Sequence, residues 1–321
     1  MIKFEDITLI VQGAVDRENT PKCLKSIRKY FPGSTIIVST WEGTNVSSLD
    51  YDELLLNIDP GGFKDKNCDF INNIKRQLVS TQNGLAKIKT QYAMKLRSDL
   101  IFESSTFLSY FNAFPKREDQ YSFFSKRVIF CSFFFKKYVG QIKHAVQPVP
   151  FHISDWLAFG LTSDLRKLYN IPLPVEPDNT DYFFHNPYTG IKPKLLGPRH
   201  QYSPEQYIGY ISIKEAFPDV AFENMLDYSS ENIAFFERFV ASNCIILNPC
   251  QFKLVCNKDN GSDKYSIWTR DQFEIPKFLW EGVYRHDVFL DDYKKYCDIN
   301  FKTPLRVKLE RLVYKFLHRK K

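Results

Sequence analysis

Apolar residues in the first hundred positions form short runs that are separated by longer, more polar stretches. The runs at residues 7–11, 35–39, 54–57 and 92–96 are mostly apolar, as is typical of the buried strands of a parallel sheet. Before the last of them, residues 72–88 repeat apolar side chains with helical spacing. Strands and helices that alternate in this way predict an α/β fold with a mixed, mostly parallel central sheet flanked by helices.

The segment between the first two strands carries the signals of a crossover helix. Thr20 and Pro21 suit an N-cap and a first helical position, and Pro32 with Gly33 suits the end of the helix. Two strands joined by this helix would form a βαβ unit, whose crossover is expected to be right-handed.

The remainder of the chain has weaker patterns. Residues 171–202 are rich in Pro, Asn and Asp, and so long a loop in a compact protein usually serves as a lid or a binding loop. Ser203, Pro204 and Gln206 have the residue types of a capped helix start. Further expected elements are helices at 107–114, 165–169, 203–217 and 231–242, one or two strands within 121–135, a strand-and-turn stretch at 152–160, a strand at 244–247, and a turn-rich loop at 258–264.

Polar residues follow each of the predicted strands in the first hundred positions. The carboxyl ends of parallel strands meet at one edge of a sheet, and α/β proteins bind their ligands there. We therefore expect one shared site to be lined by the residues at these strand ends, which are Gln12, Gly13, Thr40, Trp41, Asp59 and Asp99.

The tripeptide Arg97-Ser98-Asp99 interrupts an apolar run, and such residues are costly to bury without partners. A carboxylate at a strand end is a hard oxygen ligand that suits Mn²⁺ or Mg²⁺ carrying a diphosphate, which makes Asp99 the candidate metal ligand. Arg97 can pair with a phosphate or with that carboxylate. The alternative is an ordinary salt bridge at the end of a strand.

Composition is that of a globular protein with an excess of positive charge. The 321 residues are 44% hydrophobic and 25% charged, with a net charge of +7, which fits one large α/β domain with additions or two smaller domains. Residues 304–321 hold seven Lys or Arg and one acidic residue. The rest of the chain is therefore close to neutral, and a nucleic-acid partner is not expected.

Cysteine usage and the absence of long apolar runs indicate a cytoplasmic protein. Seven cysteines without a CxxC spacing argue against a disulfide framework and against a structural zinc site. The N-terminal residues read as a strand rather than a secretory signal, and no apolar run has the length of a membrane span.

The C-terminal stretch has the pattern of a basic amphipathic helix. Its apolar residues recur with helical spacing while basic residues lie opposite, so the helix can lie on the anionic inner face of the cytoplasmic membrane as a peripheral contact. The alternative is a helix that packs on its own domain and exposes a solvated basic face. The apolar positions are Leu305, Leu309, Leu312, Val313, Phe316 and Leu317.

Several stretches taken in order resemble one protein family. They are ITLIVQGAVDRENTPKCLKSIRKYFPGSTIIVSTWEGTNV, then NNIKRQLVSTQNGL with YAMKLRSDL, then SDWLAFGLTSDL with the later SPEQY. The set is similar to the WavE-type family of bacterial lipopolysaccharide-synthesis glycosyltransferases. That resemblance implies a GT-A-like fold, a nucleotide-sugar donor, and assembly of a cell-envelope glycan such as lipopolysaccharide, O-antigen or capsule. GT-A enzymes bind their metal through a DxD-like motif, and this chain departs from it because Arg97 leaves Asp99 as the one carboxylate.

A nucleotide-sugar donor needs its diphosphate neutralised and its base and sugar held. Arginines suit the phosphates, a glycine lets the backbone approach a ligand, and a tryptophan can stack on a base. Asn73 and Gln77 are one helical turn apart and present two amides on one face. For each candidate the alternative is solvated charge, core packing or a helix cap. The donor-binding candidates are Gln12, Gly13, Arg17, Thr40, Trp41, Asn73, Arg76, Gln77 and Arg97.

Two carboxylates are candidates for the general base of an inverting transfer. Asp155 lies between apolar residues, which would desolvate it and raise its pKa, and Glu205 lies in the first turn of a helix, where the dipole would keep it ionised. Each has a structural role as its alternative. His286 is a candidate second metal ligand, and His200 is a weaker candidate for the diphosphate.

The expected organisation is a GT-A-like domain over residues 1–300, with a nucleotide-binding half at 1–103 and an acceptor-binding half at 104–300, followed by the basic helix at 301–321. The expected activity is metal-assisted transfer of a sugar to a lipid-linked or oligosaccharide acceptor. Two alternatives remain: transfer of another nucleotide-activated group or of the nucleotide itself, and a non-catalytic carbohydrate- or membrane-binding partner of a glycan-assembly complex.

Overall fold

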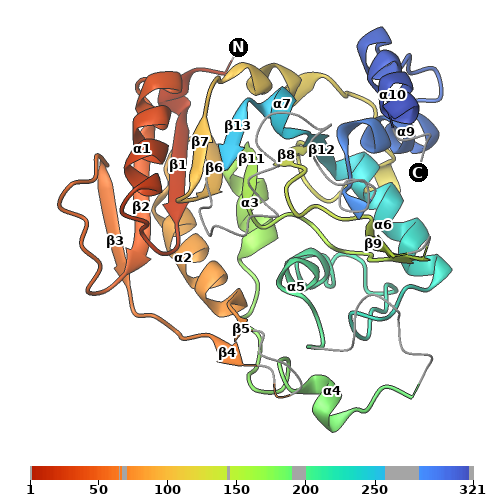
Figure 1. Ribbon diagram of the computed structural model, residues 1–321, viewed down its shortest axis with the longest axis horizontal. Coiled ribbons are helices and arrows are strands. Elements are labelled where there is room, and N and C mark those ends of the chain that lie inside the picture. The colour runs from red at the N-terminus through yellow and green to blue at the C-terminus, as the bar shows by residue number, and fades with distance from the viewer. Residues whose placement is uncertain are drawn as a thin grey trace.

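A seven-stranded sheet forms the centre of the computed structural model, which describes residues 2–64, 66, 71–142, 145–189, 200–256 and 282–317 (Figure 1). The strand order is β12-β8-β11-β6-β1-β2-β3. Strand β11 is antiparallel to both of its neighbours, and the other pairings in this sheet are parallel. The strands are β1 (Ile7–Gln12), β2 (Thr35–Trp41), β3 (Glu53–Asn57), β6 (Tyr92–Arg97), β8 (Val128–Cys131), β11 (Leu157–Leu161) and β12 (Cys244–Leu247).

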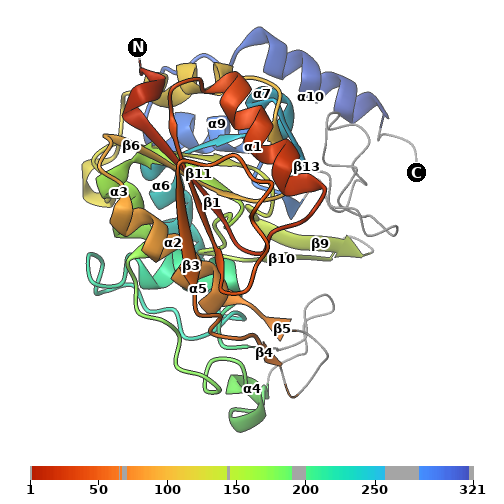
Figure 2. The same ribbon diagram turned by 90° about the vertical axis from the view of Figure 1, so that its left-hand side faces the viewer.

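Helices cover both faces of this sheet, which confirms the predicted fold class. Figure 2 shows α1 (Asn19–Tyr30) on one side of the first strands, with α2 (Ile74–Lys87) and α3 (Thr162–Tyr169) on the other side. The arrangement follows from right-handed crossovers, because the chain moves outward from β1 to β2 and back across the sheet from β3 to β6.

The start of α1 differs from its prediction. The helix begins at Asn19, so Thr20 lies inside it rather than at the N-cap. The carboxylate of Asp16 accepts hydrogen bonds from the backbone N–H groups of Glu18 and Asn19, and the Thr20 hydroxyl accepts one from the N–H of Asp16. Asp16 therefore satisfies the free N–H groups of the helix end, a role that carboxylates fill as readily as threonines.

The second half of the chain is less regular than predicted. The expected helix at 107–114 is a 3-10 helix, and the helix at 286–296 was not expected. Residues 121–135 contain one strand, β8, within the expected one or two. The predicted loop at 258–264 lies outside the described residues. The remaining elements are η1 (Phe4–Asp6), β4 (Phe63–Lys64), β5 (Ile71–Asn72), β7 (Leu100–Phe102), η2 (Thr106–Asn112), η3 (Asp119–Tyr121), β9 (Tyr138–Ile142), β10 (Ala145–Pro148), α4 (Tyr182–His185), α5 (Pro204–Ile211), α6 (Ser230–Asn243), α7 (Pro249–Phe252), β13 (Leu254–Cys256), α9 (His286–Tyr296) and α10 (Leu305–Leu317).

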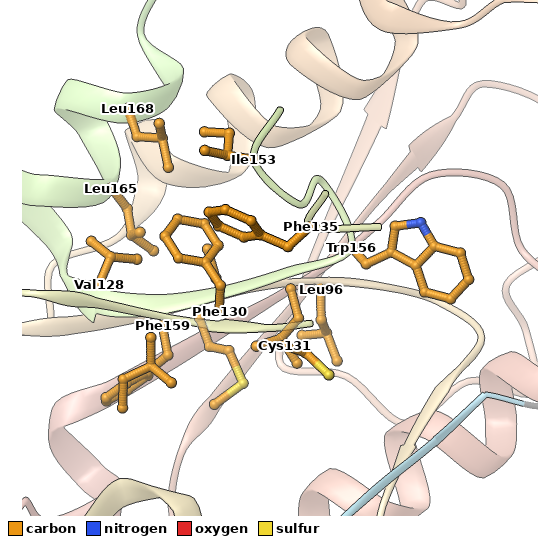
Figure 3. Packing of buried hydrophobic residues seen from close by; sticks show 14 of the residues in the cluster. Leu96, Val128, Phe130, Cys131, Phe135, Ile153, Trp156, Phe159, Leu165 and Leu168 are labelled. Carbon is orange, nitrogen blue, oxygen red and sulfur yellow. The ribbon is translucent and has the colours of Figure 1, made fainter. Parts of the chain in front are cut away.

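One large hydrophobic cluster extends from β1 to α10 and includes residues of both predicted halves. Figure 3 shows its centre, where Leu165 and Leu168 of α3 lie over one side of the strands and Phe159 of β11 points to the other side. On that other side Phe159 packs edge-on against Phe107 and Phe111. The division into a nucleotide-binding and an acceptor-binding half stays a prediction.

Gly209 of α5 marks the closest approach between this helix and the segment that leads into β11. A Cβ atom on Gly209 would collide with the backbone carbonyl oxygen of Phe151. We expect Gly209→Ala to lower the free energy of unfolding by about 1–3 kcal/mol, because backbone atoms cannot move aside as a flexible side chain can. Thermal denaturation measures this change.

Gly84→Ala in α2 is the matched control for that substitution. A Cβ on Gly84 would meet the Ile10 side chain at 2.6 Å, a less severe overlap than the one with the Phe151 carbonyl oxygen at Gly209, so the loss should be smaller. In both helices an alanine also has the better intrinsic propensity, by roughly 0.5–1 kcal/mol. A higher melting temperature for Gly209→Ala would show that α5 does not depend on this contact.

Candidate active site

A cavity of about 680 Å³ opens at the carboxyl ends of the parallel strands. Nine of the residues with a predicted catalytic, donor-binding or metal-binding role line it, although they come from five separate parts of the chain. Asp99 and Gln12 share this cavity, as the predicted meeting of strand ends requires. The nine are Gln12, Gly13, Trp41, Asn73, Arg76, Gln77, Arg97, Asp99 and Asp155.

The register of the sheet explains why the ends of β1 and β6 meet here. Gln12 is paired with Arg97 on one side and with Ser39 on the other. The side-chain oxygen of Gln12 accepts a hydrogen bond of 2.7 Å from the hydroxyl of Ser80 on α2. The next residue, Gly13, has a φ of +101°, so the chain turns away from the sheet in a conformation that favours glycine.

Arg97 and Asp99 form a bidentate pair across the turn between β6 and β7. The guanidinium donates hydrogen bonds of 2.9 and 2.5 Å to the two carboxylate oxygens, and it lies 4.3 Å from the centre of the Trp156 ring. Burial is the largest single influence and opposes the charge of Arg97, but Asp99 and Asp155 together outweigh it, so the pKa of Arg97 is raised. The arginine is thus a fixed, permanently charged group at the cavity.

A second arginine at the cavity has a similar carboxylate partner. Arg76, in the first turn of α2, donates two hydrogen bonds of 2.7 Å to Asp59 and one of 2.9 Å to the side-chain oxygen of Asn73. The hydrogen bonds from Arg76 lower the pKa of Asp59. Both pairs resemble the bidentate geometry in which arginines bind phosphates, so a diphosphate could replace either carboxylate as the partner.

Asp155 brings a carboxylate of a different kind into the cavity. It lies just before β11, is only 5% exposed, and its Oδ1 has no hydrogen-bond partner among the described residues. Its backbone carbonyl accepts a hydrogen bond from the buried Lys95 ammonium. Burial and the nearby Glu205 raise the pKa of Asp155, while Lys95 and Arg97 partly oppose the rise.

Glu205 lies close enough to Asp155 to affect its pKa, but it does not line the cavity. It occupies the first turn of α5, and its carboxylate is 3.7 Å from the Nε2 atom of His152. Burial raises the pKa of Glu205. Burial also lowers the pKa of His152 to about 3, so this imidazole is neutral at physiological pH. Glu205 can therefore influence the charge of Asp155 without touching a ligand in the cavity.

Three further predicted residues are not brought to the cavity. Thr40 is fully buried, and its backbone carbonyl accepts a hydrogen bond from Asn57. Its neighbour Trp41 does line the cavity, as expected from the alternation of side chains along a strand. Arg17 is exposed next to the lining residue Asp16, and His200 is buried but absent from the lining.

His286 lies in the core and is not part of the lining of the cavity that contains Asp99. Its Nδ1 lies 2.7 Å from the carbonyl oxygen of Ile246, and its ring packs edge-on against Tyr110 and Phe114. Burial lowers the pKa of His286 to about 4, so the ring is neutral. The expected metal ligand is thus a structural residue at the start of α9, an element that the sequence pattern did not reveal.

Among the described residues, a metal ion held by Asp99 would have fewer than three protein ligands of the usual metal-binding types. Within the described ranges, no three His, Cys, Asp or Glu side chains converge on one point. Both oxygens of Asp99 already accept hydrogen bonds from Arg97. A bound Mn²⁺ or Mg²⁺ would need most of its oxygen ligands from a phosphate ligand and water, and its requirement stays a prediction.

Six lining residues had been given no catalytic, donor-binding or metal-binding role. Asn19 begins α1 and Asp16 precedes it, and Ser98 donates a hydrogen bond of 2.6 Å to the carbonyl of Ala14, which joins the loops after β1 and β6. Asp59 had been expected at the site as the end of a strand, without a role of its own. The signal that could have found them is position, since all follow or flank predicted strand ends. They are Ala14, Val15, Asp16, Asn19, Asp59 and Ser98.

Comparison with known families matches residues 7–314 of this chain to the model described as WavE lipopolysaccharide synthesis. The chain belongs to the WavE family. The match confirms the resemblance and extends it to nearly the whole chain, including α10. This WavE protein is thereby assigned to lipopolysaccharide synthesis.

Other comparisons add little to that assignment. No curated protein sequence matches this WavE protein. Among solved structures it is similar to 4-diphosphocytidyl-2C-methyl-D-erythritol synthase from Anaerococcus prevotii DSM 20548. The two are 12% identical, the match covers 72% of this chain and 95% of that chain, and the TM-score is 0.33.

Proposed function

We propose that this protein is a glycosyltransferase that moves a sugar from a nucleotide-sugar donor to a growing cell-envelope glycan. One observation carries the proposal. A single cavity at the carboxyl ends of the parallel strands combines two arginine–carboxylate pairs with a buried carboxylate that has an unpartnered oxygen. The first feature suits a diphosphate, and the second suits a proton acceptor.

In the proposed reaction, the two arginines bind the diphosphate of the donor. Negative charge grows on the diphosphate as its bond to the sugar breaks, and Arg97 and Arg76 are placed to donate charge-assisted hydrogen bonds to it. Trp41 and Gln77 complete this side of the cavity, and the Oε1 atom of Gln77 has no hydrogen-bond partner within the described part of the chain. They offer a ring and an amide for a base or a sugar.

In the same reaction, Asp155 acts on the acceptor as the general base. In the proposed step the acceptor oxygen forms a bond to the anomeric carbon of the sugar, and the bond from this carbon to the diphosphate breaks. The hydroxyl proton passes to Asp155, and the electron pair of the broken bond leaves with the diphosphate. We assign the base to Asp155 rather than Glu205 because only Asp155 lines the cavity. This step inverts the configuration of the sugar.

A divalent metal ion is proposed as an assistant of the donor. Asp99 is the residue that would hold Mn²⁺ or Mg²⁺ with the diphosphate, and the ion would help to neutralise this leaving group. Because Arg97 also neutralises it, we expect Asp99→Asn to weaken the metal-dependent part of donor binding and to leave metal-free nucleotide binding measurable.

A thermal-shift panel of nucleotides and nucleotide sugars tests the function, with and without Mn²⁺. One nucleoside diphosphate should stabilise the protein by about 2.7 kcal/mol when present at a hundred times its dissociation constant. Its sugar conjugate should then be slowly hydrolysed or transferred to an acceptor, with release of the nucleoside diphosphate.

Product analysis separates the alternatives in the same experiment. Release of pyrophosphate instead of a nucleoside diphosphate would indicate nucleotidyl transfer. Stabilisation by no nucleotide, together with no turnover of any nucleotide sugar, would contradict the proposal and favour a non-catalytic partner in glycan assembly. Full metal-dependent activity of Asp99→Asn would remove Asp99 as the metal ligand and leave the rest of the proposal standing.

A further inference from the structure

The last described helix, α10, is attached to the protein by one side. Val307 is buried, and Arg311 forms ion pairs with Asp287 at 3.4 Å and with Asp291 at 2.9 Å, both on α9. The Arg311 guanidinium also donates a hydrogen bond to the backbone carbonyl of Asp287. Figures 1 and 2 both show α10 next to α9 at the periphery of the molecule.

The opposite side of α10 presents leucines to solvent. Leu305, Leu309 and Leu312 are 72%, 53% and 63% exposed, and their spacing puts them on one stripe of the helix. Val307 and Arg311 lie roughly opposite that stripe, at about 100° per residue. The expected alternative, in which the apolar side packs on the domain, is therefore wrong for these leucines. Single exposed leucines are common, but three in one stripe indicate a surface that is covered in use.

Basic residues flank the leucine stripe on both sides. Arg306 and Lys308 are exposed, and their positions fall on either edge of the stripe. The sequence from Lys302 to Lys321 contains eight Lys or Arg and one acidic residue. An apolar stripe between rows of positive charge matches a surface that is apolar inside and anionic outside.

We propose that α10 docks this protein on an anionic lipid bilayer. Leu305, Leu309 and Leu312 would lie below the phosphate groups, with Arg306 and Lys308 at the headgroups. The helix has 13 residues, too few to span a bilayer, so it would lie parallel to the surface. A second copy of the chain fits less well, because a symmetric contact would bring the basic edges of two stripes together. The inference concerns placement and does not depend on the proposed reaction.

Co-sedimentation of the purified full-length protein with vesicles tests this docking without donor or acceptor. Vesicles of phosphatidylcholine alone are compared with vesicles that contain about 30% phosphatidylglycerol, at low and high salt. We expect binding to the anionic vesicles, weaker binding at high salt, and little binding to phosphatidylcholine alone. Leu305→Ser/Leu309→Ser/Leu312→Ser should lower the affinity at least tenfold, and Lys308→Glu about fivefold or more.

Val175→Ser is the matched control, since Val175 is an exposed apolar residue (70%) outside α10. This variant should bind anionic vesicles like the wild type. No binding by the wild type, or equal loss for the control and the triple serine variant, would overturn the proposal. A concentration-dependent dimer that the triple serine variant abolishes, with no vesicle binding, would overturn it too and assign the stripe to a second copy of the chain.

Discussion

Asp155→Asn is expected to lower the rate of sugar transfer by about 10²–10⁴-fold, the range typical for loss of a general base. The side chain keeps its shape but can no longer take the acceptor's proton. Donor binding should change little, because the arginine pairs that suit the diphosphate are separate from Asp155. Steady-state kinetics with a saturating donor measure the rate, and titration with the nucleoside diphosphate measures binding.

Folding should not explain that loss. The pKa of Asp155 is raised by burial, so the folded state binds its proton more tightly than the unfolded state does. Its ionisation therefore reduces stability as the pH rises above the ordinary carboxyl range. Replacing it with neutral Asn should leave the melting temperature at neutral pH unchanged or higher. Transfer at near wild-type rate in a folded Asp155→Asn protein would show that Asp155 is not the base.

Glu205→Gln is the companion variant that separates the two candidate bases. Glu205 raises the pKa of Asp155 through its negative charge. Removing this charge should lower the pKa of Asp155 and shift the acidic limb of the kcat/KM profile to lower pH, while transfer continues. If Glu205 itself were the base, the same variant would lose activity as Asp155→Asn is expected to do.

Arg97→Ala is expected to lower kcat/KM for the donor by roughly 10²-fold or more, as the removal of one charge-stabilising donor does in other enzymes. The substitution removes the guanidinium that we propose binds the diphosphate, and it leaves the Asp99 carboxylate without its partner. Repulsion between Asp99 and the phosphates should then add to the loss. The donor concentration dependence of the rate measures both kcat and KM.

Two other arginine variants make this prediction specific. Arg97→Lys keeps the charge but loses the planar fork that pairs with a carboxylate or phosphate, so it should recover only part of the activity. Arg17→Ala removes an exposed arginine outside the cavity lining and should have a small effect. Equal losses for Arg17→Ala and Arg97→Ala would indicate that general positive charge near the β1 end, rather than the placed pair, attracts the donor.

The first half of the fold was predictable because a strand that is buried on both faces of the sheet is apolar at most positions. All six residues of β1 are buried, and such strands have no polar side to confuse the pattern. Their ends were therefore found, and the cavity at Gln12, Trp41 and Asp99 followed from topology. The pairing of Arg97 with Asp99 was foreseen as one of two outcomes for that arginine.

What could not be predicted depends on contacts between distant parts of the chain. His286 was a candidate metal ligand because of its late position in the chain, where the family resemblance implies one, yet it contacts Ile246, Tyr110 and Phe114 in the core. Glu205 and Asp155 were equal candidates for the general base from the sequence. The structure separates them, because Asp155 lines the cavity and Glu205 does not. The outward side of α10 was equally hidden, since the amphipathic pattern alone does not say which side the rest of the protein covers.

The reversed direction of β11 has a consequence for how this enzyme family can diversify. Its first residue, Leu157, is paired with Leu96 near the end of β6, so the beginning of one strand meets the endings of its neighbours. Asp155 thus reaches the cavity from a connection that precedes a strand, whereas Arg97 and Gln12 reach it from strands that end there. In the proposed reaction, a longer or exchanged connection before β11 would remodel the acceptor side of the cavity and leave the donor side at the ends of β1 and β6 unchanged.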